Sequence, residues 1–221
     1  MRWLLFLFGA LMLGKPAMAI EEPKYETVLQ DARFEVRQYA PVIIAETWVD
    51  GDMDAASSKG FRAIADYIFG NNKAPQNSAG GKIAMTAPVT MEPQSSSSKI
   101  AMTAPVALQP ASDVSDLVRA QRWRVQFVMP REYTMASLPT PNNAAVTVRE
   151  VPAKSVAIAK YSGFNSESRI QAETKALAAW MQARKLAAAS PAQLARYDPP
   201  WTLPMWRRNE IHIEISPNPA L

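Results

Sequence analysis

An internal repeat constrains the fold of this chain more than any other feature of its sequence. Residues 34–51, FEVRQYAPVIIAETWVDG, align without gaps on residues 146–163, VTVREVPAKSVAIAKYSG, at an offset of 112. The identical residues are Val36 and Val148, Arg37 and Arg149, Ala45 and Ala157, and Gly51 and Gly163. Such self-similarity indicates duplication. We therefore expect two copies of one structural unit, over about 25–130 and 140–215.

Each copy begins with the pattern of two short strands. Apolar residues alternate at the start, as at Phe34 and Val36 in the first copy. A proline, Pro41 or Pro152, then interrupts the pattern, and an apolar run rich in β-branched residues follows. Alternation and β-branched runs are typical of strands, and proline is typical of the break between them.

A helix and closing strands complete each copy. Asp52 or Asp54 is placed to cap the first helix, and Ser166 precedes the second. The apolar residues with helical spacing are Phe61, Ile64, Ala65 and Ile68 in the first copy and Ile170, Leu177 and Met181 in the second, with Trp180 at the edge. Residues 123–130 and 209–215 read as strands. The order β-β-α-β-β, twice, predicts an α+β fold with an antiparallel sheet curled around or packed by two helices.

A second, shorter repeat lies between the two units. The octapeptide KIAMTAPV occurs at residues 82–89 and again at 99–106. Its alternating apolar residues favour a strand, and Pro88 and Pro105 favour an edge position because proline donates no backbone hydrogen bond. Two interpretations stay open: a duplicated β segment beside a cavity, or two edges whose Met85 and Met102 flank a ligand groove.

The first 19 residues have the features of a secretory leader. Arg2 precedes an apolar run from Trp3 to Leu13, and residues 17–19, AMA, fit a cleavage site. The run is shorter than the ~20 residues that span a bilayer. We expect cleavage before Ile20, a soluble periplasmic protein with no stable membrane insertion, and one domain over residues 20–221.

Charge and cysteine content exclude several classes of function. The chain has 24 basic and 20 acidic residues, and two of the basic ones lie in the predicted leader, so no basic stripe for nucleic acid is expected. The absence of cysteine excludes disulfides, thiolate metal sites and covalent haem attachment. One histidine gives no recognisable catalytic constellation, so we expect a protein that is not an enzyme. Glu46, Glu173 and Glu210 are the candidates for a catalytic carboxylate, but their spacing marks no acid/base pair.

Five segments together resemble the SOUL haem-binding family. They are YIFGNN, the KIAMTAPV element, FVMPREYTMASLPTPNN, VREVPAKSVA and YDPPWTLPMWRRNEI, in this order, and the resemblance runs from Glu22 to Ile215. It implies two β-α-β-β type repeats that form a distorted antiparallel β-barrel with two long helices. It also implies non-covalent binding of haem or another tetrapyrrole in an apolar groove beside the first helix, for storage, buffering or trafficking.

The resemblance and the residue types select the candidate haem site. Arg207 and Arg208 are candidates for pairing with propionates. The groove candidates are Phe61, Ile64, Ala65, Ile68, Met85, Met102, Tyr197 and Trp201, although the four helix residues fit a plain core equally well. On the first helix, better-studied relatives have basic and Met residues near the porphyrin. The matching positions in this chain are occupied by Ser58, Phe61, Ala65 and Asp66. Another small lipophilic ligand, bound or hydrolysed in the same cavity, and a scaffold without ligand are the alternatives.

His212 is the only histidine and hence a candidate iron ligand. In the segment EIHIEI, the isoleucines share one face of the expected strand, which places His212 with Glu210 and Glu214 on the other. A histidine on a polar face favours solvation or a hydrogen bond to a carboxylate over iron ligation. Met85, Met102 and Tyr197 are the other candidate ligands, or the iron has none from the protein.

Overall fold

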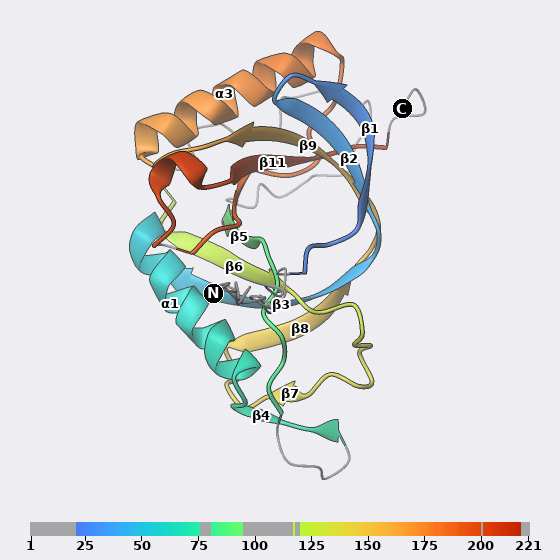
Figure 1. The fold of residues 1–221 in the computed structure, drawn as a ribbon, viewed down its shortest axis with the longest axis vertical. Coiled ribbons are helices and arrows are strands. Elements are labelled where there is room, and N and C mark those ends of the chain that lie inside the picture. Colours follow the sequence, from blue (N-terminus) through green and yellow to red (C-terminus); the bar gives the residue numbers. More distant parts are fainter. Residues whose placement is uncertain (1–20, 76–80, 95–116, 118–119, 200, 218–221) are drawn as a thin grey trace, which may run out of the picture.

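The computed structural model describes residues 21–75, 81–94, 117, 120–199 and 201–217. These residues form a nine-stranded antiparallel sheet that curls into a half-barrel, with two long helices (Figure 1). The predicted leader, residues 1–19, and the second octapeptide, residues 99–106, lie outside the described residues. Within the described residues no helix is long and apolar enough to cross a membrane.

The order of the elements follows the predicted pattern of the two repeats. The helices are α1 (Met53–Ile68) and α3 (Glu167–Ala183), with a short 3-10 helix η2 (Pro204–Trp206). The strands of the large sheet are β1 (Tyr25–Asp31), β2 (Phe34–Tyr39), β3 (Val42–Asp50), β5 (Val89–Pro93), β6 (Arg122–Val128), β8 (Val146–Val151), β9 (Lys154–Tyr161), β10 (Gln193–Arg196) and β11 (Asn209–Ile215). The strands β4 (Asn72–Lys73) and β7 (Thr140–Pro141) form a separate pair.

The two repeats exchange their first strands. The sheet order is β1-β2-β9-β11-β10-β5-β6-β3-β8, so β2 of the first repeat pairs with β9 of the second, and β8 pairs with β3. In these pairs Val36 lies opposite Ala157, and Val148 lies opposite Ala45. Two of the four residues that are identical in the sequence repeat, the valine and the alanine, thus face each other across the two copies. The strands β5 and β10 join the halves in the middle of the sheet.

Both helices begin where the sequence predicted and cover the outside of the sheet. The Asp52 side chain caps α1 by accepting the Ala55 N–H at 2.8 Å, and Ser166 caps α3 in the same way. Helix α1 packs on β3 and β6, and α3 packs on β9 and β11 (Figure 1). Gly60 of α1 lies directly against Val125 of β6, where an added Cβ would be 2.4 Å from a Val125 methyl group. This contact sets how closely α1 approaches the sheet.

The first octapeptide corrects one prediction. Only Val89 of residues 82–89 lies in a strand, β5, and Thr86 forms an isolated bridge to Glu21. Ile83 and Ala87 are buried, so the apolar residues do pack inward, but along an irregular segment. The hydroxyl of Thr86 donates to the Val128 carbonyl, a contact typical of a segment that lies across the sheet end and not within a ladder.

Candidate functional site

The face of the sheet turned away from the helices, here called the inner face, is charged and yet buried. Side chains alternate along a strand, so the apolar residues that meet α3, such as Val36 and Ile211, leave Arg37 and Glu210 on the inner face. The side chains of Arg37 and Glu210 are both 0% exposed. Buried charges require partners, and the inner face supplies them.

Glu210 is the centre of this network. Arg37 donates to its two carboxylate oxygens at 3.0 and 3.1 Å, and the Tyr197 hydroxyl donates at 2.6 Å. Arg208 Nε donates at 3.0 Å. Burial raises the pKa of Glu210, but the hydrogen bond with His212 and the charge of Arg37 outweigh it, so the pKa lies well below its usual range. Glu210 is therefore ionised and fixed in place.

His212 lies beside Glu210 on the inner face, as the alternation of EIHIEI predicted. Its Nε2 is 2.8 Å from Glu210 Oε2, and the residue is only 7% exposed. The Tyr39 ring lies 6.4 Å from the imidazole, centre to centre. Among the described residues no group of three or more His, Cys, Asp or Glu side chains is arranged to hold a metal ion. The arrangement is that of a histidine hydrogen-bonded to a carboxylate.

A second charged cluster occupies the other half of the inner face. Arg149, the repeat equivalent of Arg37, donates from two nitrogens to Glu46, each at 2.9 Å. Arg124 pairs with Glu92, which also accepts a hydrogen bond from Gln193 at 3.1 Å. The arginine that is identical in the two repeats thus forms a two-bond ion pair in each half, but with glutamates from non-equivalent strands.

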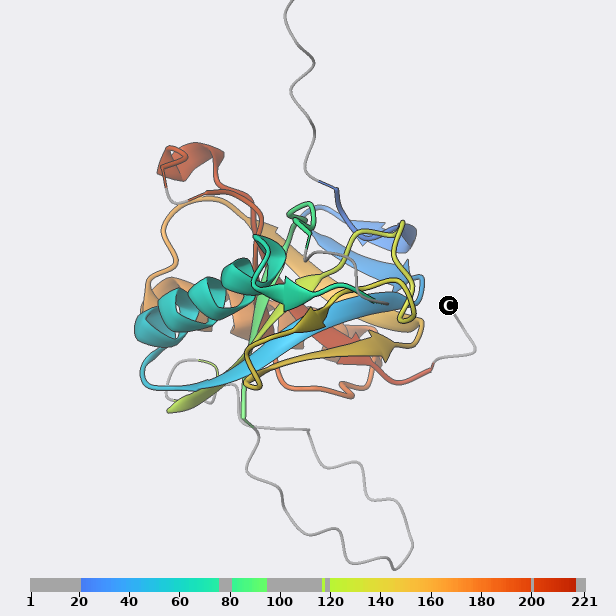
Figure 2. The ribbon, with the colours of Figure 1, turned by 90° about the horizontal axis from the view of Figure 1, so that it is seen from below.

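The segment before β11 carries exposed apolar side chains that we call the aromatic tip. Trp201 is 82% and Trp206 72% exposed, and Figure 2 shows η2 projecting from the body of the protein. The tip comprises Phe164, Trp201, Leu203, Met205 and Trp206. Two hydrogen bonds to backbone carbonyls hold it: the Gly163 N–H donates to the Pro204 carbonyl at 2.9 Å, and the Arg207 side chain donates from Nε to the Thr202 carbonyl at 2.7 Å.

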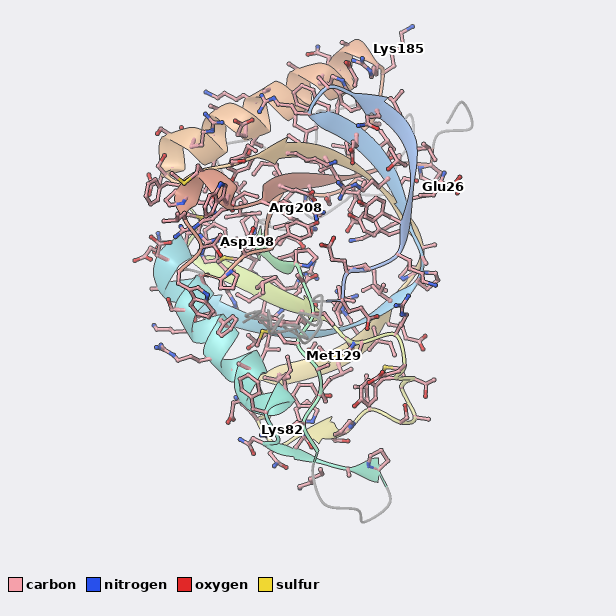
Figure 3. The ribbon with its side chains drawn as sticks, in the orientation of Figure 1. Glu26, Lys82, Met129, Lys185, Asp198 and Arg208 are labelled. Carbon is pink, nitrogen blue, oxygen red and sulfur yellow. The ribbon has the colours of Figure 1, made fainter. Side chains whose placement is uncertain are left out.

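A small pocket of about 220 Å³ lies beside the tip and is here called the basic pocket. Its lining residues are Lys160, Tyr161, Ser162, Trp206, Arg207 and Arg208. Three of the six are cationic and none is acidic, and two of the cations already have carboxylate partners outside the pocket: Lys160 pairs with Glu35, and Arg208 pairs with Glu210. Arg208 also pairs with Glu22 at 3.0 Å, and its backbone N–H donates to Asp198 at 2.6 Å, which fixes its position (Figure 3). The pocket has the charge and size for a carboxylate or a similar small anion.

A larger cavity of about 620 Å³ opens at one end of the half-barrel, and we call it the barrel-mouth cavity. Its walls come from residues 21–24, 40–43, 128–131, 133–134 and 150–152 and from Thr86. These segments are the N-terminal entry to β1, the corners between β2 and β3 and between β8 and β9, and the end of β6. The cavity shares no lining residue with the basic pocket.

The structure brings together some of the predicted site residues and separates others. Tyr197, Arg208 and His212 meet at Glu210, and Arg207 and Trp201 lie on the segment next to them. Ile64, Ala65 and Ile68 are buried in the core under α1. Phe61 is 39% exposed and packs on Phe127, with ring centres 5.5 Å apart. Met85 is half-buried, and Met102 lies outside the described residues.

Sequence reasoning missed Lys160, Phe164, Trp206 and the role of Arg37. The identity of Arg37 and Arg149 in the repeat was a usable signal, since both arginines form buried or half-buried ion pairs. Lys160 had no signal of its own, because it reaches the basic pocket only through the pairing of β9 with β11. Glu46 and Glu210, considered as catalytic carboxylates, are each tied to arginine.

Comparison with known proteins agrees with this fold. A family model described as "SOUL heme-binding protein" matches residues 20–98 and 90–214. No curated protein matches the chain. The C-terminal domain of EcmrR is similar in structure, with a TM-score of 0.56 and 10% sequence identity over 88% of this chain and 99% of that one.

Two structures from Listeria innocua are also similar. An uncharacterized conserved protein gives a TM-score of 0.53 at 13% identity, over 83% of this chain and 92% of that one. A protein named as a hydrolase gives 0.50 at 12% identity, over 86% and 94%. At these identities the likeness concerns the fold alone.

Proposed function

Because the chain belongs to the SOUL haem-binding family, we propose that it binds haem or a related tetrapyrrole non-covalently, between the aromatic tip and the basic pocket. The observation that carries this proposal is the position of three cationic side chains directly beside the exposed Trp206. A tetrapyrrole presents the same two features in one molecule, a flat apolar ring and charged propionates.

The chemistry of the residues fits this ligand. Exposed tryptophan, phenylalanine and methionine side chains offer flat or adaptable apolar surface to a macrocycle. Arg207 and Arg208 offer planar guanidinium groups for carboxylates, and Lys160 adds a point charge. Arg196, at the end of β10, contacts Ser57 of α1 at 3.2 Å, so the segment leading to the tip lies next to the first helix. This is the side of the protein where the family resemblance placed the groove.

Haem iron, when bound, would supply ligand binding or redox chemistry, and we assign its retention to contacts other than His212. The imidazole is nearly buried, and its Nε2 is engaged with Glu210. Replacing His212 by Ala should therefore leave haem affinity within a factor of a few. The protein holds the ring by apolar contact and the propionates by charge.

We further propose a carrier and not an enzyme, acting in the periplasm in storage, buffering or trafficking. The exposed tip suits exchange of a ligand with a partner, because a site at the surface needs no opening of the fold. The leader-like residues 1–19 support export. Mass spectrometry of the protein from cells should give a chain that begins at Ile20. An intact Met1 would contradict export with cleavage.

Titration of haem into the protein at neutral pH, followed in the visible spectrum, tests the binding proposal. We expect saturation in the micromolar range or tighter, with a broad and weakly shifted Soret band. Trp206→Ala should weaken binding, because it removes the aromatic wall of the basic pocket. Trp48→Ala is the matched control, since Trp48 is 41% exposed on β3 and lines neither pocket. No saturable change in the wild type would overturn the proposal, and equal losses in both variants would place the site elsewhere.

A further inference from the structure

The barrel-mouth cavity is unexplained by tetrapyrrole binding at the tip. Its volume, about 620 Å³, falls within the range of about 300–1,000 Å³ that is typical of small-molecule sites. In Figure 3, Met129 of the cavity lies well apart from Arg208 of the basic pocket. The two sites therefore have different walls, although the ion pair between Glu22 of the cavity and Arg208 of the basic pocket makes them neighbours.

More than half of the residues that line the cavity are apolar. Four prolines line it: Pro23, Pro41, Pro130 and Pro152. Proline presents ring methylenes and has no backbone N–H. Aliphatic side chains of β3, β6 and β8, such as Val42, Val128 and Val151, form much of the remaining surface. A ligand in this cavity meets hydrocarbon on several sides.

The most buried polar side chain of the cavity, that of Thr86, already has a partner. The Thr86 hydroxyl donates to the Val128 carbonyl. Among the described residues, the buried side-chain nitrogens without a hydrogen-bond partner are Arg124 Nε and Arg196 Nε, and neither residue lines the cavity. No unsatisfied buried side-chain group therefore calls for a charged or strongly polar ligand there.

The lining of the cavity carries three acidic and two basic side chains, and Arg208, outside the lining, pairs with the additional acidic one. Glu21 accepts the Arg131 N–H at 3.1 Å and forms an ion pair with the Arg131 side chain at 3.3 Å. Glu22 pairs with Arg208. Of the other lining residues, Lys24 and Glu150 are both exposed and carry opposite charges. An ionic ligand therefore gains no net electrostatic attraction from these paired side chains. An uncharged apolar ligand does not have to break any of the pairs.

From these four observations we propose that the barrel-mouth cavity is a second binding site, which takes an uncharged lipophilic molecule of small-drug size. Tyr133 supplies the aromatic wall and, at its hydroxyl, one polar contact for such a ligand. The site is independent of the basic pocket and of the aromatic tip, and it binds its ligand whether or not a tetrapyrrole is present.

Nile red, a neutral dye whose emission shifts to the blue in apolar surroundings, is the probe that tests the proposal. The wild-type protein should give saturable, blue-shifted emission. Ala40→Trp should lower the affinity about tenfold or more, because Ala40 lines the cavity and its side chain is exposed, so the indole enters the cavity without disturbing the core. Val151→Trp, on the strand next to Val42, should have the same effect.

Ala153→Trp is the matched control, since Ala153 is exposed at the corner after β8 and does not line the cavity. Its dye affinity should equal that of the wild type, as should that of a Trp201→Ser, Trp206→Ser double variant. Added haem should not displace the dye. Wild-type affinity in both cavity-filling variants, loss of dye binding in the tip variant, or tighter binding of an anionic or cationic dye than of Nile red would each overturn the proposal. A failed haem titration would leave it intact.

Discussion

Arg37 and Glu210 form a two-bond ion pair, at 3.0 and 3.1 Å, in which neither side chain is exposed to solvent. The pair joins β2 of the first repeat to β11 of the second, although β9 lies between these strands in the sheet. Because both charged groups are buried, removing one of them leaves the other without its partner and lowers the stability of the fold strongly. This pair is a point at which the two repeats depend on each other.

Replacing Arg37 by Met should destabilise the protein strongly. The change removes one of the two guanidinium partners of the buried Glu210 carboxylate, and breaking a buried ion pair typically costs about 3–5 kcal/mol. Arg122→Met is the comparison, because the Arg122–Asp50 pair is 3.6 Å long and both side chains are more than half exposed. Its loss should cost under about 1 kcal/mol. Urea unfolding measures both, and similar losses would contradict the assignment.

Acid should destabilise the protein through Glu210. Its pKa in the folded state lies below the value of 4.5 for an ordinary glutamate, so the unfolded chain takes up a proton first as the pH falls. The contribution to stability is therefore present above that value and is lost as the pH falls toward the folded pKa. Glu210→Gln should flatten the fall in the free energy of unfolding below about pH 4.5. Glu26→Gln, at an exposed position on β1 (Figure 3), should leave the slope unchanged.

Gly60→Ala should destabilise the protein despite the higher helix propensity of alanine. The new Cβ would lie 2.4 Å from Val125 Cγ2 and 2.7 Å from Val125 Cβ, and the Cβ is too close to the backbone to move away. Overpacking of this kind costs about 1–3 kcal/mol. Combining it with Val125→Ala should recover only part of the loss, because the contacts with the two Val125 methyl groups disappear while the 2.7 Å contact with the Cβ of residue 125 remains. Ser58→Ala, exposed on the same helix, should cost nothing measurable in thermal unfolding, whereas a neutral Gly60→Ala would show that α1 shifts freely.

Charge pairing with propionates can be separated from ring contact by changing the ligand. Lys160→Gln and Arg207→Gln should each weaken haem binding about tenfold, equivalent to about 1.4 kcal/mol. With haem dimethyl ester, which lacks the propionate charges, the same variants should bind as the wild type does. Lys185→Gln, at the far end of α3 (Figure 3), is the control for overall charge. Equal effects on haem and its ester would contradict a propionate role for the basic pocket.

The order of the elements was predictable from the sequence, and the pairing of the two repeats was not. Alternation, capping residues and proline breaks are local signals, and they located α1, α3, β6 and β11 correctly. The exchange of β2 and β8 depends on pairing between strands that are far apart in the sequence, and no local pattern indicates it. The strand β10 lacks alternation strong enough to be recognised, and the alternation of the first octapeptide misled because that segment crosses the sheet end.

The candidate site was predictable where it follows from strand geometry. The position of His212 beside Glu210 follows from alternation in one strand. The burial of Arg37 does not follow from its sequence pattern, because a charged residue in an alternating strand usually lies on the solvent side. Here the sheet curls, so its polar face is enclosed. The basic pocket joins residues 160–162 to residues 206–208, and no local pattern connects them.

The exchange of first strands gives the two halves of the chain a relationship like that of subunits in an obligate dimer. A polypeptide that ended in the loop between β6 and β8 would lack the strand that flanks β3, and would present β2 with no β9 to receive it. Neither fragment has a complete sheet of its own. Expressed together as separate chains, the two should assemble through the contacts of the intact protein, and expressed alone, each should aggregate through its open strand edges.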